Sequence, residues 1–199
     1  MINLLDLDRD AINALIADKP YRGDQVLQWL YRKRIDDISG MSNLPKDLRE
    51  RIARRAVIAY PSVDRHQVAS DTTEKFAYRL ADGQIIESVL IPEEDHWTIC
   101  VSSQVGCAMG CRFCCTAQLG FRRNLTPGEI LAQVLMPMQR YPERLFRNIV
   151  VMGMGEPLLN YANVVQAVRI LSDERGPDIS TRRITISTCG IIPHLGSLW

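Results

Sequence analysis

Residues 96–115 read HWTICVSSQVGCAMGCRFCC, an apolar, β-branched run followed at once by four of the chain's six cysteines. The run predicts a buried β-strand, and the cysteines belong to the loop at its carboxyl end. Their spacing is Cys107-x3-Cys111-x2-Cys114, with Cys115 directly behind. Three thiolates on one loop can ligate three irons of a four-iron cubane cluster. The remaining iron then keeps an open position, where a metal centre can bind a substrate or cofactor.

Two other interpretations of the cysteines stay open. A zinc site would use four ligands in paired spacings, so the fourth would have to come from Cys100, Cys115, Cys189 or a histidine. The thiols could also be buried packing residues. Structural disulfides are not expected, because the sequence shows neither a signal peptide nor an apolar run of about 18 residues that could span a membrane. We therefore expect a cytoplasmic protein whose thiols stay free or bind metal.

Helical and strand patterns alternate after the cysteines. Strands are predicted at 96–104, 147–155 and 182–190, and helices at 125–141 and 160–176. This alternation indicates an α/β fold with a parallel sheet and helices outside it. Ligands of such folds gather at the carboxyl ends of the strands. We therefore expect the cysteines to meet two other segments at one rim, GMGEP (153–157) and STCG (187–190).

The helix at 125–141 carries its own start signal. Thr126 is a cap, Pro127 lies in the first turn and Glu129 follows three residues after the cap, which is a capping box. Pro137 lies further along the same pattern, and we expect it to kink or end the helix.

The part before residue 93 divides into two regions. Three short amphipathic patterns predict a helical module over residues 1–58. Residues 59–92 hold two strand-like runs around Asp82-Gly83, a β-hairpin signal. The remaining range, 93–199, holds the parallel strands, and three such strands are too few for a closed barrel, so we expect the chain to be a fragment. The three helical patterns cover residues 8–19, 23–34 and 44–55.

Basic residues concentrate in the helical module. The segment 19–65 has eleven Lys or Arg against six Asp or Glu, within a chain of net charge +1. Such a module is compatible with binding a phosphate backbone, and a solvated helix face is the alternative. RNA binding by the module can be tested by neutralising three consecutive basic residues, Arg32, Lys33 and Arg34.

Four motifs in order carry a family resemblance: CVSSQVGCAMGCRFC (100–114), GFRRNLTPGEI (120–130), VVMGMGEPLLN (150–160) and ITISTCGIIP (184–193). Together with residues 21–50 they resemble the RlmN family of dual-specificity RNA methyltransferases, which are radical S-adenosylmethionine (SAM) enzymes. The resemblance implies a partial radical SAM (β/α) barrel of three strands, with a small helical domain and a β-hairpin connection. It also implies methylation of carbon 2 of adenine in 23S rRNA and tRNA through a methyl-cysteine intermediate.

The same resemblance implies cofactors, partners and roles for single residues. The cofactors are a 4Fe-4S cluster and S-adenosyl-L-methionine, and the partners are the two RNAs and a reducing electron donor such as flavodoxin, with a monomeric protein and no membrane. Glu87 matches a proton acceptor, and Cys100 matches a cysteine that assists methyl transfer. The cofactor positions are Cys107, Cys111 and Cys114 for the cluster and Gly155, Glu156 and Ser187 for SAM.

The chain departs from the family pattern in one important respect. The family's second, mobile cysteine lies near its carboxyl terminus, and neither Cys115 nor Cys189 fits its place. We therefore expect these 199 residues alone to lack methyl transfer. A related enzyme that methylates carbon 8 (Cfr) and a zinc-stabilised RNA-binding module without catalysis remain alternatives.

Overall fold

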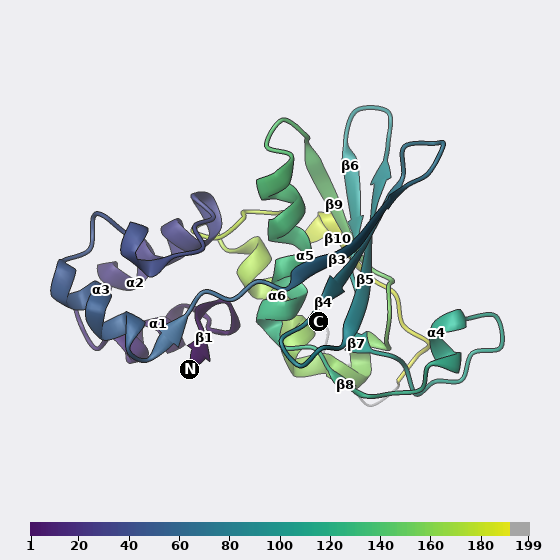
Figure 1. The fold of residues 1–199 in the computed structure, drawn as a ribbon, viewed down its shortest axis with the longest axis horizontal. Helices are drawn as coiled ribbons and strands as arrows, with labels where there is room; N and C mark the ends of the chain where they lie inside the picture. The colour runs from purple at the N-terminus through teal and green to yellow at the C-terminus, as the bar shows by residue number, and fades with distance from the viewer. Residues whose placement is uncertain (192–199) are drawn as a thin grey trace.

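Three short helices form a module at one end of the computed structural model, which describes residues 1–191 (Figure 1). They are α1 (Arg9–Ile16), α2 (Tyr21–Leu27) and α3 (Lys46–Ala53), and α2 continues as a π-helical turn to Arg32. The strands β1 (Ile2–Asn3) and β2 (Ala56–Val57) pair in parallel and bring the two ends of the module together. The three predicted helices are confirmed. α1 and α3 are shorter than their patterns, and α2 with its π-helical turn begins two residues earlier than its pattern and ends two residues earlier, at Arg32. Their buried side chains include Ile12, Leu15, Val26, Leu30, Leu48 and Ile52.

Six strands form the main sheet in the order β10-β9-β6-β5-β4-β3. The first three of this order run parallel, as predicted, and the other three are antiparallel. The hairpin at Asp82-Gly83 is confirmed, with Gly83 at φ +82° in the turn. A strand that the sequence patterns did not predict, β3, extends the sheet beyond the hairpin. The bounds are β3 (Ser62–Val68), β4 (Glu74–Arg79), β5 (Ile85–Pro92), β6 (Trp97–Cys100), β9 (Phe146–Val151) and β10 (Ile184–Ile186).

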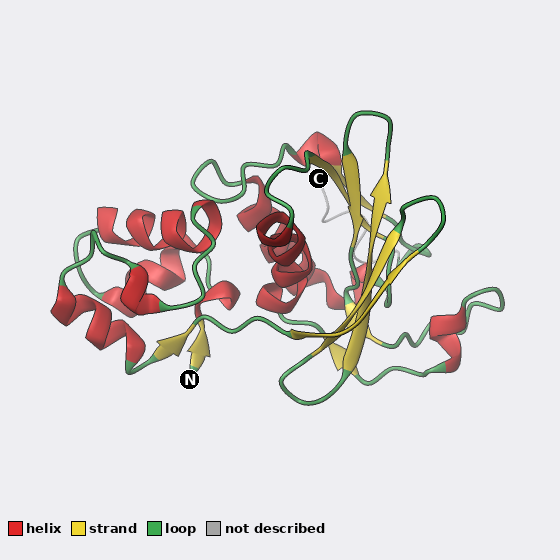
Figure 2. Cartoon of the chain, turned by 45° about the horizontal axis from the view of Figure 1, so that its top comes forward, coloured by secondary structure: helices red, strands yellow, loops and turns green. Residues whose placement is uncertain are grey.

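Two helices, α5 (Pro127–Arg140) and α6 (Tyr161–Ser172), lie between the helical module and the sheet (Figure 2). The capping box of α5 is confirmed, because Thr126 and Glu129 exchange side chain to backbone hydrogen bonds. We expected Pro137 either to kink α5 or to end it. The helix does not end at Pro137 and continues to Arg140. A proline in the last turn removes only the bond to the carbonyl four residues earlier, which α5 tolerates. No helix within residues 1–191 has the length and apolar character to cross a membrane.

The start of the chain attaches the helical module to these two helices. Leu4 and Leu5 are fully buried, and the Asp6 carboxylate accepts a 2.8 Å hydrogen bond from the backbone N–H of Gly128 in the first turn of α5. A carboxylate at this position also complements the helix dipole. Gln166 of α6 donates to the Asp6 carbonyl at 2.8 Å. The module is therefore hydrogen-bonded to both helices of the body.

The basic run of the module serves this interface. Arg32 donates to the carbonyl of Glu174, and Arg34 donates to the carbonyl of Met138, at 2.7 and 2.9 Å. The Lys33 ammonium lies 3.9 Å from the centre of the Trp29 ring. These three charges thus have partners within the protein, and neutralising them would loosen the module as well as change its surface charge.

Candidate functional site

The cysteines lie on a loop that projects from the sheet and carries the short helix α4 (Cys115–Gln118) (Figure 1). A two-residue ladder closes the base of this loop, where β7 (Gln104–Val105) pairs with β8 (Arg123–Asn124). Gly106 follows at φ +73°, and a Cβ atom there would lie 1.7 Å from the carbonyl oxygen of Gly120. Glycine is therefore required at Gly106 by both backbone conformation and space. We call this contact the neck of the cysteine loop.

Replacing Gly106 by alanine is expected to open the neck. Gly120→Ala is the matched control, because Gly120 also has positive φ (+66°) but its Cβ would meet nothing within 4 Å. In the control, the left-handed backbone conformation alone costs about 1–2 kcal/mol. We therefore expect proteolysis of its loop to be roughly tenfold faster than in the wild type. Gly106→Ala adds the clash and should exceed the control by about another tenfold or more. Equal cleavage rates for the two variants in limited proteolysis would contradict a tight neck.

The loop offers three thiols in similar surroundings. Cys107, Cys111 and Cys114 are half-buried and free, whereas Cys115 is exposed. Backbone hydrogen bonding from Ala117 lowers the pKa of the Cys114 thiol, which favours the thiolate that a metal needs. No three His, Cys, Asp or Glu side chains within residues 1–191 already converge as a metal site. The donor set nevertheless fits an iron–sulfur cluster, since soft thiolates on one loop are its usual ligands.

Glu156 lies at the same rim and joins the ends of two strands. Its side chain is buried, and it accepts hydrogen bonds from the Thr188 hydroxyl (2.6 Å) and the Cys189 backbone N–H (2.9 Å). Burial alone would raise the pKa of Glu156, but hydrogen bonds from Cys189 and Thr188 lower it overall. The hydrogen bond to this carboxylate in turn raises the pKa of Cys189 to about 11. The backbone N–H of Glu156 also donates to the Gln104 side chain at the base of the cysteine loop. The base of the cysteine loop, GMGEP and STCG therefore meet at one rim, as predicted.

The glycines of GMGEP let its backbone pass close to the segment that leads into the cysteine loop. A Cβ on Gly153 would lie 2.7 Å from the Ser102 hydroxyl oxygen, and one on Gly155 would lie 2.6 Å from the Gln104 Cβ. Gly155 also has φ +106°. Gly155 matches a cofactor position of the family. The structure gives a second reason for a glycine there, because only a glycine allows these two segments to come so close.

A buried polar cluster, Ser102 to Gln104, holds the rim together, and the sequence analysis did not identify it. The Gln133 side chain of α5 bonds both the N–H and the carbonyl of Ser102, at 2.8 and 3.0 Å. Gln104 accepts a bond from the Glu156 N–H at 2.9 Å, and Asn160 donates to the Ser103 carbonyl at 2.8 Å. A run of polar residues between a buried strand and the first cysteine was the available signal.

Glu87 and Cys100 lie on the same face of the sheet. Cys100 pairs with Val89 of β5, and Glu87 lies two residues before Val89. This is the face opposite to Ile86 and Leu90, which are fully buried. Burial raises the pKa of Cys100, so its thiol stays protonated at neutral pH. The Glu87 carboxylate is half-exposed and lies 3.1 Å from Nζ of Lys75.

Ser187 lies on the same face of the sheet as Cys100. Cys100 is on β6, β9 is the neighbouring strand, and Ser187 directly follows β10, the strand beyond β9. Val150 pairs with Cys100 on one side and with Thr185 on the other, and Ser187 comes two residues after Thr185. Its side chain is exposed just past the end of β10. The register thus places Ser187 near the rim where Glu156 holds the STCG segment.

Comparison with known proteins agrees with this geometry. Residues 101–197 match the radical SAM superfamily, and residues 2–58 match the ribosomal RNA large subunit methyltransferase N-terminal domain. A solved radical SAM methyltransferase from Sphaerobacter thermophilus superimposes with a TM-score of 0.90 at 42% identity, over 100% of this chain and 60% of that one. The fold and the cysteine loop therefore define a radical SAM protein.

The more particular relationship comes from a curated sequence. The dual-specificity RNA methyltransferase RlmN of Solidesulfovibrio magneticus is 49% identical over 98% of this chain. The chain belongs to the RlmN family, which confirms the resemblance found in its motifs. It spans 58% of the length of that relative. Radical SAM proteins of this family use a 4Fe-4S cluster and S-adenosylmethionine.

Proposed function

We propose that this chain is the cofactor-binding part of a radical SAM enzyme that methylates carbon 2 of adenine in 23S rRNA and tRNA. The supporting observation is the convergence at one rim of the base of the cysteine loop, Glu156 and the segment that follows β10. The 49% identity to an enzyme named as a dual-specificity RNA methyltransferase supports the reaction and the substrate class. A cytoplasmic, monomeric protein with a reducing electron donor fits this proposal.

Each proposed site residue has a task that its surroundings allow. Cys107, Cys111 and Cys114 would hold the cluster, which together with SAM supplies the radical chemistry that an electron-poor ring carbon requires. The carboxylate of Glu156 fixes the STCG segment beside the loop through Thr188 and the Cys189 N–H. These hydrogen bonds are made entirely within the chain.

Two further residues would handle protons on the open face of the sheet. The Cys100 thiol keeps its proton because burial disfavours the thiolate, so Sγ can donate a proton or hydrogen bond. The Glu87 carboxylate is the proposed proton acceptor, and Lys75 Nζ restricts where it points. Gly155 and Ser187 would contact SAM from the ends of β9 and β10.

Anaerobic reconstitution tests the cofactor proposal directly. The purified chain is incubated with iron and sulfide, desalted and analysed for metal. We expect about four irons per chain, and a cluster signal in electron paramagnetic resonance after reduction. A chain that takes up zinc alone and gives no cluster signal would instead be the zinc-stabilised RNA-binding module, and the enzymatic proposal would be wrong.

The reconstituted chain also tests the methylation proposal. We propose that these 199 residues bind the cluster but do not methylate RNA, because no residue matches the mobile cysteine of the family. Incubation with SAM, a reductant and RNA, followed by mass analysis of the nucleosides, should give no methyladenosine. Product at carbon 2 would show the chain to be sufficient by itself, and product at carbon 8 would favour the related reaction.

A further inference from the structure

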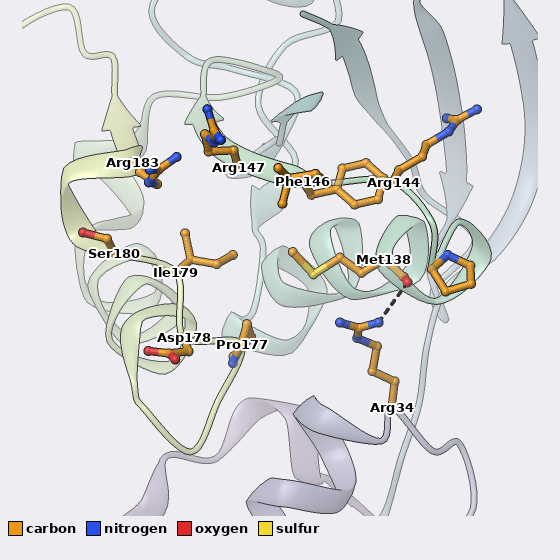
Figure 3. Close-up of a pocket in the computed structure, with 12 residues that line it drawn as sticks. Arg34, Met138, Arg144, Phe146, Arg147, Pro177, Asp178, Ile179, Ser180 and Arg183 are labelled. Carbon is orange, nitrogen blue, oxygen red and sulfur yellow. Dashed lines mark hydrogen bonds between the residues drawn. The ribbon is translucent and has the colours of Figure 1, made fainter. Parts of the chain in front are cut away.

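A cavity of about 460 Å³ is lined by residues at the start of β9 (Figure 3), the end of this strand opposite to the cysteine loop. It opens between the helical module, α5 and the segment that leads into β10. Phe146 begins β9 at this cavity, whereas Val151 ends β9 at the cysteine rim. Six strand residues at about 3.3 Å each place the two sites roughly 20 Å apart. The cavity is therefore separate from the proposed catalytic site.

Guanidinium groups dominate the charged lining of this cavity. Arg34, Arg144, Arg147 and Arg183 line it, and Asp178 is the one carboxylate among the lining residues. The Asp178 carboxylate already accepts a 3.2 Å hydrogen bond from Arg32, outside the lining set. The cavity thus has an excess of positive charge.

The four arginines differ in how many donors they have left. The guanidinium of Arg144 pairs with the buried Glu74 and points away from the cavity, so its donors do not face a ligand there (Figure 3). Arg34 donates to the Met138 carbonyl and closes the side toward the helical module. Arg147 gives one N–H to Asp95 at 3.0 Å. Arg183 is exposed, and no carboxylate within residues 1–191 pairs with it.

Arg147 and Arg183 lie at the same edge of the cavity (Figure 3). Arg147 is the second residue of β9, and Arg183 ends the 3-10 turn (Thr181–Arg183) directly before β10, the strand that pairs with β9. Asp95 offsets part of the charge of Arg147, whereas no carboxylate within residues 1–191 pairs with Arg183, so a bound oxyanion would supply the counter-charge that this edge lacks. Arginine pairs of this kind suit phosphate, because each guanidinium can offer two parallel N–H donors.

Apart from Asp178 and Ser180, the other lining residues of the cavity are apolar. Met138, Phe146 and Ile179 lie between the arginines at its two sides (Figure 3). A volume of 460 Å³ is in the range of pockets that take a small organic molecule, and is larger than an inorganic ion needs. A ligand with an anionic group and a flat, less polar part would use both surfaces.

We propose that this cavity binds a nucleotide, with its phosphate on Arg147 and Arg183 and its base or ribose on the apolar floor. The nucleotide is either one unit of an RNA strand or a free nucleoside monophosphate. The inference is independent of the methylation chemistry, because it concerns another rim of the sheet and requires no iron or SAM.

Binding is measured on the whole chain without reconstitution, by fluorescence anisotropy with a labelled eight-nucleotide RNA and, directly, by isothermal titration calorimetry with AMP. The test variant is Arg147→Gln/Arg183→Gln. The matched control is Arg182→Gln, since Arg182 is the exposed neighbour of Arg183 and does not line the cavity. The double variant should weaken RNA binding about tenfold and lower the salt slope by about 0.7 per lost phosphate contact, with the control within about twofold of wild type.

The two sources of the ligand separate in this experiment. Loss of RNA affinity in the double variant identifies a strand nucleotide, and loss of AMP binding with unchanged RNA binding identifies a free nucleotide; either supports the proposal. A loss of affinity in Arg182→Gln as large as that in the double variant would reveal unspecific charge attraction and overturn it. So would unchanged binding of RNA and AMP in the double variant, once circular dichroism shows that the variant is folded.

Discussion

The Cys111→Ala variant is expected to lose the iron–sulfur cluster, with bound iron falling from about four per chain to below one. Cys111 is the central ligand of the proposed set, and its neighbours Cys107 and Cys114 cannot hold the cluster alone. The electron paramagnetic resonance signal of the reduced protein should disappear with the iron. Iron analysis and spectroscopy of the anaerobically reconstituted variant measure both effects.

Cys115→Ala is the matched control for this experiment. Cys115 follows Cys114 directly, but it is exposed at the first position of α4, whereas the three proposed ligands are half-buried. We expect the control to bind iron as the wild type does. If Cys115→Ala lost as much iron as Cys111→Ala, the assignment of ligands within the loop would be wrong. Retention of a full cluster by Cys111→Ala would exclude Cys111 as a ligand.

The cysteine spacing could be recognised from sequence because it lies within eight residues, and the same is true of the capping box of α5. The neck could not be recognised in this way. Gly106 and Gly120 are fourteen positions apart in the sequence, and only the folded loop brings the carbonyl of one to the Cα of the other. The positions of glycines in the sequence do not show which of them lies against the backbone of another segment.

Contacts across longer separations explain the other differences. Gln133 bonds Ser102 from 31 residues away, and Asn160 reaches the Ser103 carbonyl from 57. Neither residue type predicts such a partner in advance. The charge of Arg32 predicted a surface role, yet its hydrogen bonds to Glu174 and Asp178 cross more than 140 residues. Local patterns therefore predicted most of the elements and the proposed ligands, but not β3 and not the contacts that hold the elements in place.

Glu74→Ala is expected to lower the free energy of unfolding by about 3–5 kcal/mol, the range typical of a buried charge pair that loses one partner. Glu74 is 3% exposed at the start of β4. It accepts hydrogen bonds from the Tyr141 hydroxyl and from His66, each at 2.7 Å, and pairs with Arg144. The Arg144 guanidinium also lies 4.1 Å from the centre of the Trp97 ring. Removing the carboxylate leaves this arginine without its counter-charge.

Urea denaturation measures the loss, and Glu87→Gln provides the comparison. Glu87 is also a strand glutamate with a basic partner, Lys75, but both side chains are more than 40% exposed. An exposed pair contributes about 0–1 kcal/mol, so the control should be close to wild type. Similar losses in the two variants would show that burial of the Glu74 cluster contributes little.

The pH dependence gives a second, independent test of the Glu74 cluster. Burial by itself would raise the pKa of Glu74, but hydrogen bonds from Tyr141, Arg144 and His66 outweigh it and hold the pKa below the ordinary value of 4.5. The unfolded chain therefore takes up this proton first as the pH falls. The stabilisation is complete above pH 4.5 and is lost as the pH falls through the lower, folded-state pKa.

The difference in stability between wild type and Glu74→Ala should follow this curve. It should be constant from neutral pH down to about 5 and then shrink as the solution becomes more acidic, because only the wild type has this carboxylate to protonate. Urea denaturation at a series of pH values measures it. A difference that stays the same well below pH 4.5 would mean that the loss comes from packing around the side chain rather than from its charge.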